Sequence, residues 1–242
     1  MPLVFLPGAL DGLEGSGAVA ERLGAERRLI PIAYRPDDRF EGLMARILRA
    51  ADEAGATRFD LLGQSYGGWI AQCLARLRPG RVRRMVLSHS FTLRPGDRWR
   101  LRLGSRMLER LPPALMRPLL LKRVRGALAP LRKADPALLE RQLATLGRDI
   151  ARPAFRAKLA AQQRCMAESL GLPGIAEAPG ARGPPVLIIE SDNDPLIGAG
   201  ARKALRTRYP DAALHRFADA GHISAMVETD AYLAAVMAFL DR

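Results

Sequence analysis

The sequence has few of the residues that mark disulfide-stabilised, zinc-binding or membrane-spanning proteins. Only two cysteines occur in 242 residues, Cys73 and Cys165, and they lie far apart. This pattern excludes a disulfide framework or a zinc site and predicts two buried free thiols. No apolar run approaches the ~18 residues of a membrane span. The short run at residues 2–8 lacks the basic start of a signal peptide. We therefore expect a cytoplasmic globular protein without a metal.

Acidic residues are also scarce relative to basic ones. The chain has 38 Lys and Arg against 25 Asp and Glu, a net charge of +13, and only four of the basic residues are Lys. Residues 91–133 hold twelve basic and two acidic residues, which is most of the excess. One interpretation is an amphipathic lid with its arginines in water. The alternative is a surface that meets anionic lipid or anionic acyl substrates. Nucleic acid is not expected, because no nucleic-acid-binding motif accompanies the charge.

Short apolar runs alternate with helical patterns along most of the chain. Runs that predict strands occupy residues 3–6, 28–34, 59–63, 82–90, 184–190 and 212–218. Patterns that predict helices occupy residues 40–55, 67–77, 199–208 and 230–241. Such alternation is typical of a parallel sheet covered on both faces. We predict an α/β fold with a doubly wound, mostly parallel sheet of about six strands, in which Pro31 makes the second strand an edge strand.

The alternation stops between residues 90 and 183. This stretch contains no convincing strand and four helical patterns, at residues 97–111, 113–128, 136–148 and 154–171. We therefore predict a core formed by residues 1–90 and 184–242, with a helical cap at residues 91–183 inserted between the fourth and fifth strands. A cap at this point would lie over the carboxyl ends of the strands, where open α/β sheets bind ligands.

A serine follows the third predicted strand in the sequence Gly63-Gln64-Ser65-Tyr66-Gly67. A G-x-S-x-G motif between a strand and a helix is the nucleophile elbow, in which a strained turn projects the serine above the sheet. Small neighbours allow the strand and the helix to approach closely. The alternative is an ordinary strand-to-helix turn with Ser65 as the helix N-cap.

A serine nucleophile needs a base and an orienting carboxylate, and both follow at the carboxyl ends of later strands. Asp194 follows the fifth strand, with Asp192 as the competing acid, and His222 follows the sixth. The chain order serine, acid, histidine is the one expected for this elbow. His89 follows the fourth strand, and we expect it to line the substrate pocket rather than to act as a second base.

Acyl transfer also needs N–H donors for the oxyanion. We expect one donor to be the backbone N–H of Tyr66, directly after the nucleophile. The other should come from the loop after the first strand, where Gly8 allows a tight turn and Ala9 can present its N–H. Leu10 is the alternate donor and a candidate pocket residue.

Four segments together resemble the α/β-hydrolase fold family: FLPGALDG, GQSYGG, ESDNDP and AGH, in the order of that family. The segments RVRRMVLSHSF and RYPDAALHRFADAGH are similar to the maspardin-like branch, which keeps the serine but lacks the full triad. The resemblance implies a serine hydrolase that cleaves carboxylic esters of small molecules, without a cofactor. The alternatives are a maspardin-like binding protein and, on the same triad, a thioesterase, a C–C hydrolase or an acyltransferase. Asp194 and His222 favour catalysis over binding alone.

Overall fold

A computed structural model describes residues 1–10, 16–177 and 183–242 of the chain. Six strands form one sheet in the order β2-β1-β3-β4-β5-β6, and every neighbouring pair is parallel. The strands are β1 (Leu3–Leu6), β2 (Leu29–Pro31), β3 (Phe59–Gln64), β4 (Val82–Ser88), β5 (Val186–Ser191) and β6 (Ala213–Phe217). The predicted α/β sheet is therefore confirmed, and the proline-containing β2 lies at its edge.

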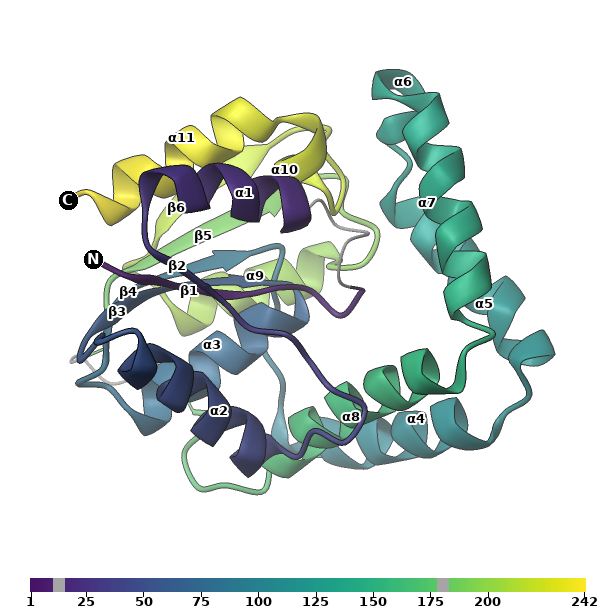
Figure 1. The fold of residues 1–242 in the computed structure, drawn as a ribbon, viewed down its shortest axis with the longest axis horizontal. Helices are drawn as coiled ribbons and strands as arrows, with labels where there is room; N and C mark the ends of the chain where they lie inside the picture. The colour runs from purple at the N-terminus through teal and green to yellow at the C-terminus, as the bar shows by residue number, and fades with distance from the viewer. Residues whose placement is uncertain (11–15, 178–182) are drawn as a thin grey trace.

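Helices cover both faces of the sheet (Figure 1). Alternate residues of β1 explain why: Leu3 and Phe5 pack in one apolar cluster, while Val4 and Leu6 pack in another. The first cluster includes α1 and α11, and the second includes α2, α3 and α9. The bounds of these helices are α1 (Ser16–Glu26), α2 (Phe40–Glu53), α3 (Tyr66–Leu77), α9 (Ala199–Arg208) and α11 (Thr229–Leu240).

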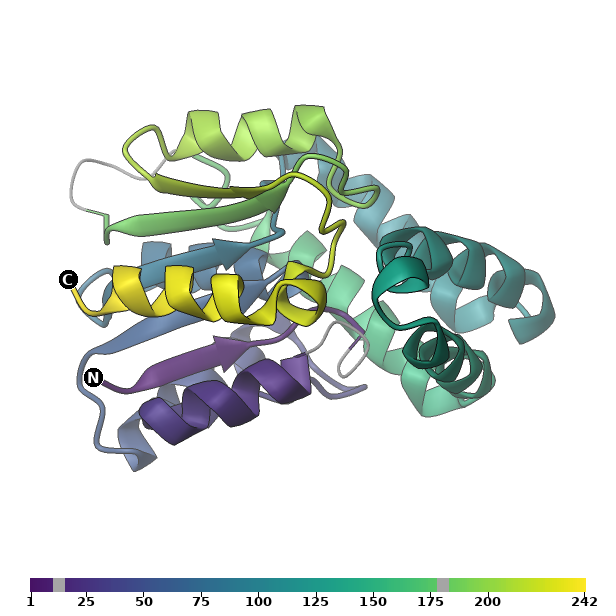
Figure 2. The same cartoon turned by 90° about the horizontal axis from the view of Figure 1, so that it is seen from above.

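The described residues between β4 and β5 form five further helices, where an inserted helical segment was predicted. They are α4 (Arg98–Arg110), α5 (Pro113–Ala127), α6 (Leu131–Ala134), α7 (Pro136–Asp149) and α8 (Pro153–Ser169), and a short 3-10 turn (Pro95–Asp97) precedes them. We call α4 to α8 the helical insertion. It lies beyond the end of the sheet toward which the strand arrows point (Figure 2). Its division from the core as a separate domain at residues 91 and 183 stays a prediction.

The insertion is joined to the core at two places. Near the end of α8, Cys165 and Met166 belong to the main apolar core, and Trp69 of α3 donates a 3.0 Å hydrogen bond to Ser169. At the other place, apolar residues of α5, α6 and α7 pack with Ile223, next to His222. α4 and α8 run side by side, and α5 and α6 pack on α7.

Three short or glycine-containing helices were not predicted: α1, α6 and α10 (Ser224–Val227). The fourth strand also ends earlier than the predicted residue 90, because His89 has a positive φ of 46° that no strand can continue. No helix in the described part of the chain is long and apolar enough to cross a membrane.

Candidate active site

Ser65 occupies a strained turn between β3 and α3. Its φ of 49° and ψ of −113° lie in a region that L-residues with side chains rarely adopt. Two contacts hold the turn, one from the end of β4 and one from the residues after it. The Ser65 N–H donates to the Ser88 carbonyl at 2.8 Å, and the Ser90 hydroxyl donates to the Ser65 carbonyl at 3.0 Å. This conformation matches the strained turn that was predicted at Ser65 and differs from that of a relaxed N-cap, since Ser65 makes no side-chain cap hydrogen bond to α3.

The glycines around Ser65 allow α3 to approach the sheet. A Cβ at Gly63 would lie 2.6 Å from the Gly67 carbonyl oxygen, closer than any side chain tolerates. A Cβ at Gly67 would lie 2.6 Å from the Pro7 carbonyl oxygen and would also meet that of Leu6. A Cβ at Gly68 would lie 2.5 Å from that of Ser90. The first turn of α3 therefore packs directly against the backbone at the end of β1.

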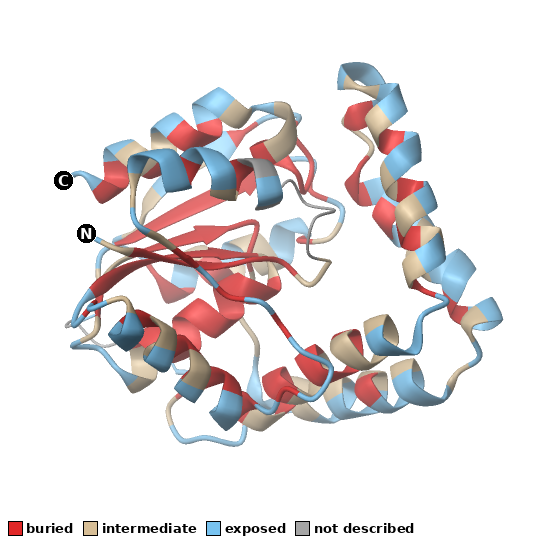
Figure 3. Cartoon of the chain, viewed as in Figure 1, coloured by how far each residue is buried: buried red, intermediate tan, exposed pale blue. Residues whose placement is uncertain are grey.

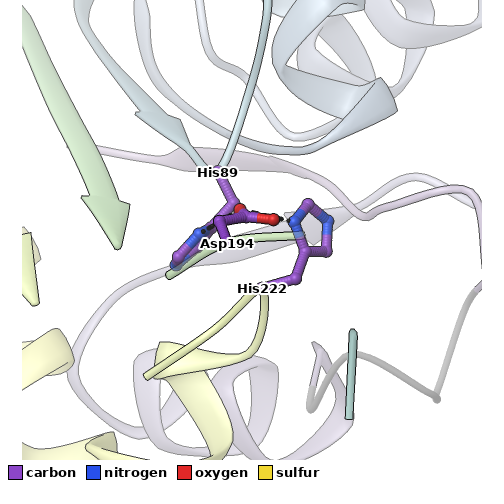
Figure 4. Close-up of side chains that lie close together, drawn as sticks. All are labelled: His89, Asp194 and His222. Atoms are coloured by element: carbon purple, nitrogen blue, oxygen red, sulfur yellow. Dashed lines mark hydrogen bonds and ion pairs between the residues drawn. The ribbon is translucent and has the colours of Figure 1, made fainter. Parts of the chain in front are cut away.

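Asp194 and His222 form a buried pair at the same edge of the sheet (Figure 4). The His222 Nδ1 lies 2.8 Å from the Asp194 Oδ2, and the two side chains are each 1% exposed. The other carboxylate oxygen of Asp194 accepts the backbone N–H groups of Leu196 at 2.9 Å and Ile197 at 3.0 Å. Asp192, the competing acid, instead forms an exposed ion pair with Arg216. The structure thus brings His222 to Asp194 and not to Asp192.

A second histidine contacts the same carboxylate oxygen. The His89 Nδ1 lies 3.0 Å from the Asp194 Oδ2, and its Nε2 lies 2.7 Å from the Ser224 hydroxyl. The two imidazole rings meet edge to face, with centroids 5.4 Å apart. The sequence analysis placed His89 beside a pocket and missed this contact. The available signal was its position: His89 directly follows β4, and Asp194 follows the adjacent β5.

Burial and hydrogen bonding act on the charges of this cluster in different ways. Burial alone would raise the pKa of Asp194, but the hydrogen bonds from His222 and His89 hold that pKa well below its usual range. Asp194 is therefore ionised, and each Nδ1 that faces it carries the proton. Burial lowers the pKa of His89, and the nearby His222 lowers it further, against the opposing effect of Asp194. His89 is thus neutral near pH 7.

This arrangement belongs to a fold that the comparisons with known proteins identify. The family model described as the alpha/beta hydrolase fold matches residues 30–229, which is most of the chain. The chain belongs to the α/β-hydrolase fold family. The comparison with curated proteins gives no match.

Solved structures of other α/β hydrolases share the same architecture. The enol-lactonase from Burkholderia xenovorans is 19% identical, with a TM-score of 0.75 and coverage of 100% of this chain and 91% of the other. A hydrolase from Pseudomonas aeruginosa is 21% identical, with a TM-score of 0.76 and coverage of 100% and 90%. MenH from S. aureus is 16% identical, with a TM-score of 0.73 and coverage of 100% and 93%. Identities this low show the shared fold and leave the substrate open.

In this α/β hydrolase, the loop after β1 lies next to the N-terminus of α3. Tyr66 is the first residue of α3, so its backbone N–H has no acceptor within the helix. The loop is held from two sides: the Tyr34 hydroxyl donates to the Pro7 carbonyl at 3.0 Å, and the Gln162 side chain of α8 donates to the Ala9 carbonyl at 3.2 Å. Leu10 is partly buried against the apolar cluster of α5 to α7. Asp11 and Gly12, the end of the FLPGALDG segment, lie outside the described residues.

The cluster of His89, Asp194 and His222 is compact enough to hold a metal ion. Among the described residues, potential ligand atoms of His89, Asp194 and His222 lie within 4.8 Å of one another. Asp194 Oδ2, however, already accepts from both imidazoles, and Oδ1 accepts two backbone N–H groups. A metal on Oδ2 would have to displace those imidazole protons. The hydrogen-bond network thus accounts for how these three side chains are arranged.

Proposed function

We propose that this α/β hydrolase cleaves carboxylic esters through an acyl-enzyme formed on Ser65. The observation that carries the proposal is the strained backbone of Ser65, which a serine without a chemical task would not need. The buried pair of Asp194 and His222 at the same sheet edge supports it. A protein that only bound ligands would gain nothing from a carboxylate held ionised against an imidazole.

The proposed reaction has two half-reactions. The Ser65 hydroxyl oxygen attacks the carbonyl carbon while His222 takes its proton, and Asp194 stabilises the imidazolium that forms. When the tetrahedral intermediate collapses, the C–O bond to the alcohol breaks and His222 returns the proton to the leaving oxygen. Water, deprotonated by His222, then attacks the acyl-enzyme, and the proton passes to Ser65 as the carboxylic acid leaves.

The oxyanion of each tetrahedral intermediate requires donors that are already in place. We propose the backbone N–H groups of Tyr66 and Ala9, with Leu10 as the alternate to Ala9. Removing one such donor costs about 3 kcal/mol of transition-state stabilisation in other enzymes. The close packing of Gly67 on the end of β1, and the hydrogen bond from Gln162 to Ala9, support a rigid placement of the two segments.

The same residues also suit related acyl chemistry. Thioesters and lactones react through the same acyl-enzyme, and the fold neighbours include an enol-lactonase. C–C bond hydrolysis and acyl transfer need the same triad as well. A panel of p-nitrophenyl esters, thioesters and lactones shows which of these three substrate classes is hydrolysed. An added alcohol acceptor detects acyl transfer.

Labelling with a fluorophosphonate tests the nucleophile without knowledge of the substrate. We expect wild type to gain one label by intact mass, and Ser65→Ala to gain none. Ser105→Ala, a buried serine in α4 away from the triad, is the matched control and should label like wild type. Labelling of folded Ser65→Ala, or no labelling of folded wild type, would reject the proposed nucleophile and move the binding-protein alternative ahead.

A further inference from the structure

The outward side of α4 carries an apolar stripe that no part of the described chain covers. Trp99, Leu103 and Met107 are spaced four residues apart, so they share one face of the helix. Their exposed fractions are 64%, 49% and 48%. The opposite face packs on α8, with Ser105 buried there. Exposure of a tryptophan to this extent loses the burial that usually stabilises a large side chain.

The next helix also carries exposed apolar side chains. Leu115 and Leu119 of α5 are 60% and 71% exposed and lie one turn apart. Thus five of the eight large apolar side chains exposed in the described structure lie on two consecutive helices. Figure 3 shows exposed residues recurring along both helices. Scattered exposed apolar residues are ordinary, but a concentration of this kind indicates an interaction surface.

Arginines surround the stripe. Arg100, Arg102, Arg106 and Arg110 of α4 are exposed, and none of them forms an ion pair with any described residue. The single acid of α4 and α5, Glu109, is already paired with Arg164 of α8. The surface therefore presents several unneutralised guanidinium groups between apolar side chains. Long arginine side chains can keep their charge in a phosphate layer while the apolar residues lie deeper.

We propose that the outward face of α4 docks on an anionic lipid surface. Trp99, Leu103 and Met107 would enter the boundary between headgroups and acyl chains, and the arginines would bind lipid phosphates. Charge complementarity selects this occupant. A second copy of the chain would oppose one arginine-rich face with another. A nucleic acid would satisfy the arginines but leave Leu103 and Met107 exposed to water.

Vesicle binding tests this surface independently of catalysis. We expect wild type to bind phosphatidylcholine vesicles containing 25% phosphatidylglycerol at least about tenfold more tightly than pure phosphatidylcholine, with affinity that falls as salt rises. The triple variant Trp99→Ser, Leu103→Ser, Met107→Ser should lose about tenfold in affinity. The matched control Leu172→Ser, Leu214→Ser changes two exposed leucines elsewhere and should bind like wild type.

Tryptophan fluorescence gives a second readout. The other tryptophan, Trp69, is fully buried in α3, so a blue shift on adding vesicles reports Trp99. Equal binding to both vesicle types, an unaffected triple variant or an unshifted emission would overturn the proposal. A dimer that forms in solution without lipid and is abolished in the triple variant would assign the face to self-association and would also overturn it.

A separate observation concerns His89, the second imidazole on Asp194. The titratable and charged groups that act on it are Asp194 and His222, in the same cluster, and Arg202. Its Nδ1–H donates to Asp194, so its Nε2 accepts the hydroxyl proton of Ser224. The backbone N–H of His89 donates to the Ile189 carbonyl of β5 at 2.8 Å, which anchors its strained φ of 46°. The neighbouring strand thus maintains a costly conformation that aims this ring at Asp194.

The geometry points to His89 as a positioning residue that fixes the carboxylate of Asp194 for His222. This inference rests on the proposed function. A neutral donor holds the carboxylate in place without cancelling its charge, which a cation would do. Ser224, two residues after His222, fixes the tautomer of His89 by donating to its Nε2. His222, the proposed base, and Ser224, which fixes the tautomer of His89, thus belong to one segment of the chain.

Kinetics of His89→Ala and His89→Asn test this role. Asn tolerates a positive φ and keeps a donor, so it should restore part of the activity. We expect His89→Ala to lower kcat on an ester about tenfold, with KM within twofold. The acidic limb of the pH–rate profile should move to higher pH, because Asp194 then shares its charge with His222 alone. Ser224→Ala should move the limb in the same direction by less.

Failure of the positioning role of His89 can be told apart from failure of the proposed function. If wild type takes a fluorophosphonate label and His89→Ala, folded by thermal melting, keeps the wild-type kcat and pH limb, the positioning role is wrong and the nucleophile stands. Equal loss of activity in His89→Ala and His89→Asn with no change in the pH limb would indicate a structural role only and would also reject it. If folded wild type takes no label, the proposed function itself fails.

Discussion

Asp194 accepts four hydrogen bonds, two at each carboxylate oxygen. Backbone N–H groups hold one oxygen and two imidazoles hold the other, so the carboxylate can neither rotate nor readily take a proton. Asp192, two residues earlier, has an exposed arginine as its partner. From the sequence, Asp194 was chosen over Asp192 only because of its position in the loop after the fifth strand. Contacts of this kind are what distinguish the two acids physically.

Replacing each acid by its amide tests that distinction. We expect Asp194→Asn to lower kcat by about 10⁴-fold, because the amide favours the wrong tautomer of His222 and cannot stabilise the imidazolium. Asp192→Asn is the matched control and should remain within about twofold of wild type. Steady-state ester hydrolysis measures both. A large loss in Asp192→Asn together with a small one in Asp194→Asn would reverse the assignment.

The sequence showed only that His89 and Asp194 follow the ends of successive predicted strands, which does not by itself predict their contact. That contact depends on the register of β4 and β5, which brings the residues after their ends together, and on a positive φ at a non-glycine residue. Neither feature has a local sequence signal. Ser65, Asp194 and His222 could be predicted because Ser65 directly follows an apolar run typical of a strand, and Asp194 and His222 lie in the loops after two further runs of this kind. Whether they act together as a triad stays a prediction until labelling and kinetics are measured.

The elbow also shows how one element constrains another. α3 begins where its first turn touches the backbone of β1, and Gly67 is the point of closest approach. A side chain there must push the helix away from the sheet and from the loop that carries Ala9. The glycines of the motif therefore keep α3 close to β1, in addition to allowing the backbone conformation of the turn.

Alanine at Gly67 measures this constraint. We expect Gly67→Ala to lower the free energy of unfolding by about 2–3 kcal/mol, as overpacking does, and Tm by roughly 5–10 °C. Gly42→Ala is the matched control, since a Cβ at Gly42 in α2 meets nothing within 4 Å. It should leave stability unchanged or raise it by about 0.5–1 kcal/mol. Thermal melts compare the two, and equal Tm values would contradict close packing at Gly67.

Most elements were predictable because their apolar patterns are strong. Every strand was predicted to within a few residues, and so were α2, α3, α9, α11 and the four long helices of the insertion. α1 was missed because its sequence contains two glycines and only two large or branched apolar residues, Val19 and Leu23, which are too few to show a helical period. α6 and α10 have four residues each, fewer than a periodic pattern needs. The exposed apolar stripe of α4 could not be predicted, because the sequence alone does not show which apolar side chains of a helix are buried and which are exposed.

At the scale of the whole molecule, the buried cluster couples stability to pH. The lowered pKa of His89 means that the unfolded chain takes up a proton first, near its ordinary pKa of about 6.5. Stability is therefore full above that pH and declines as pH falls below it. The lowered pKa of Asp194 adds a second decline, below the ordinary aspartate pKa of about 3.9, as the unfolded carboxylate is protonated.

Thermal melts between pH 8 and pH 3.5 should resolve the first decline. We expect the Tm of wild type to fall from about pH 6.5 downward, since protons favour the unfolded chain there. In His89→Asn, which has no ring to protonate, the slope between pH 7 and pH 5 should be smaller, while the fall below about pH 4 remains. An identical slope in wild type and His89→Asn over pH 7 to 5 would show that His89 does not carry this effect.

The placement of the helical insertion also dictates an order of assembly on the ribosome. All residues of β1 to β4 precede the insertion in the sequence, so these four strands are synthesised before it. β5, which covers the open side of β4, follows only about a hundred residues later, or roughly 5–20 s at ordinary rates of synthesis. During that interval β4 is a sheet edge, and edges of this kind recruit foreign strands. Its two arginines, Arg83 and Arg84, are the residues on β4 that oppose such pairing until β5 has been synthesised.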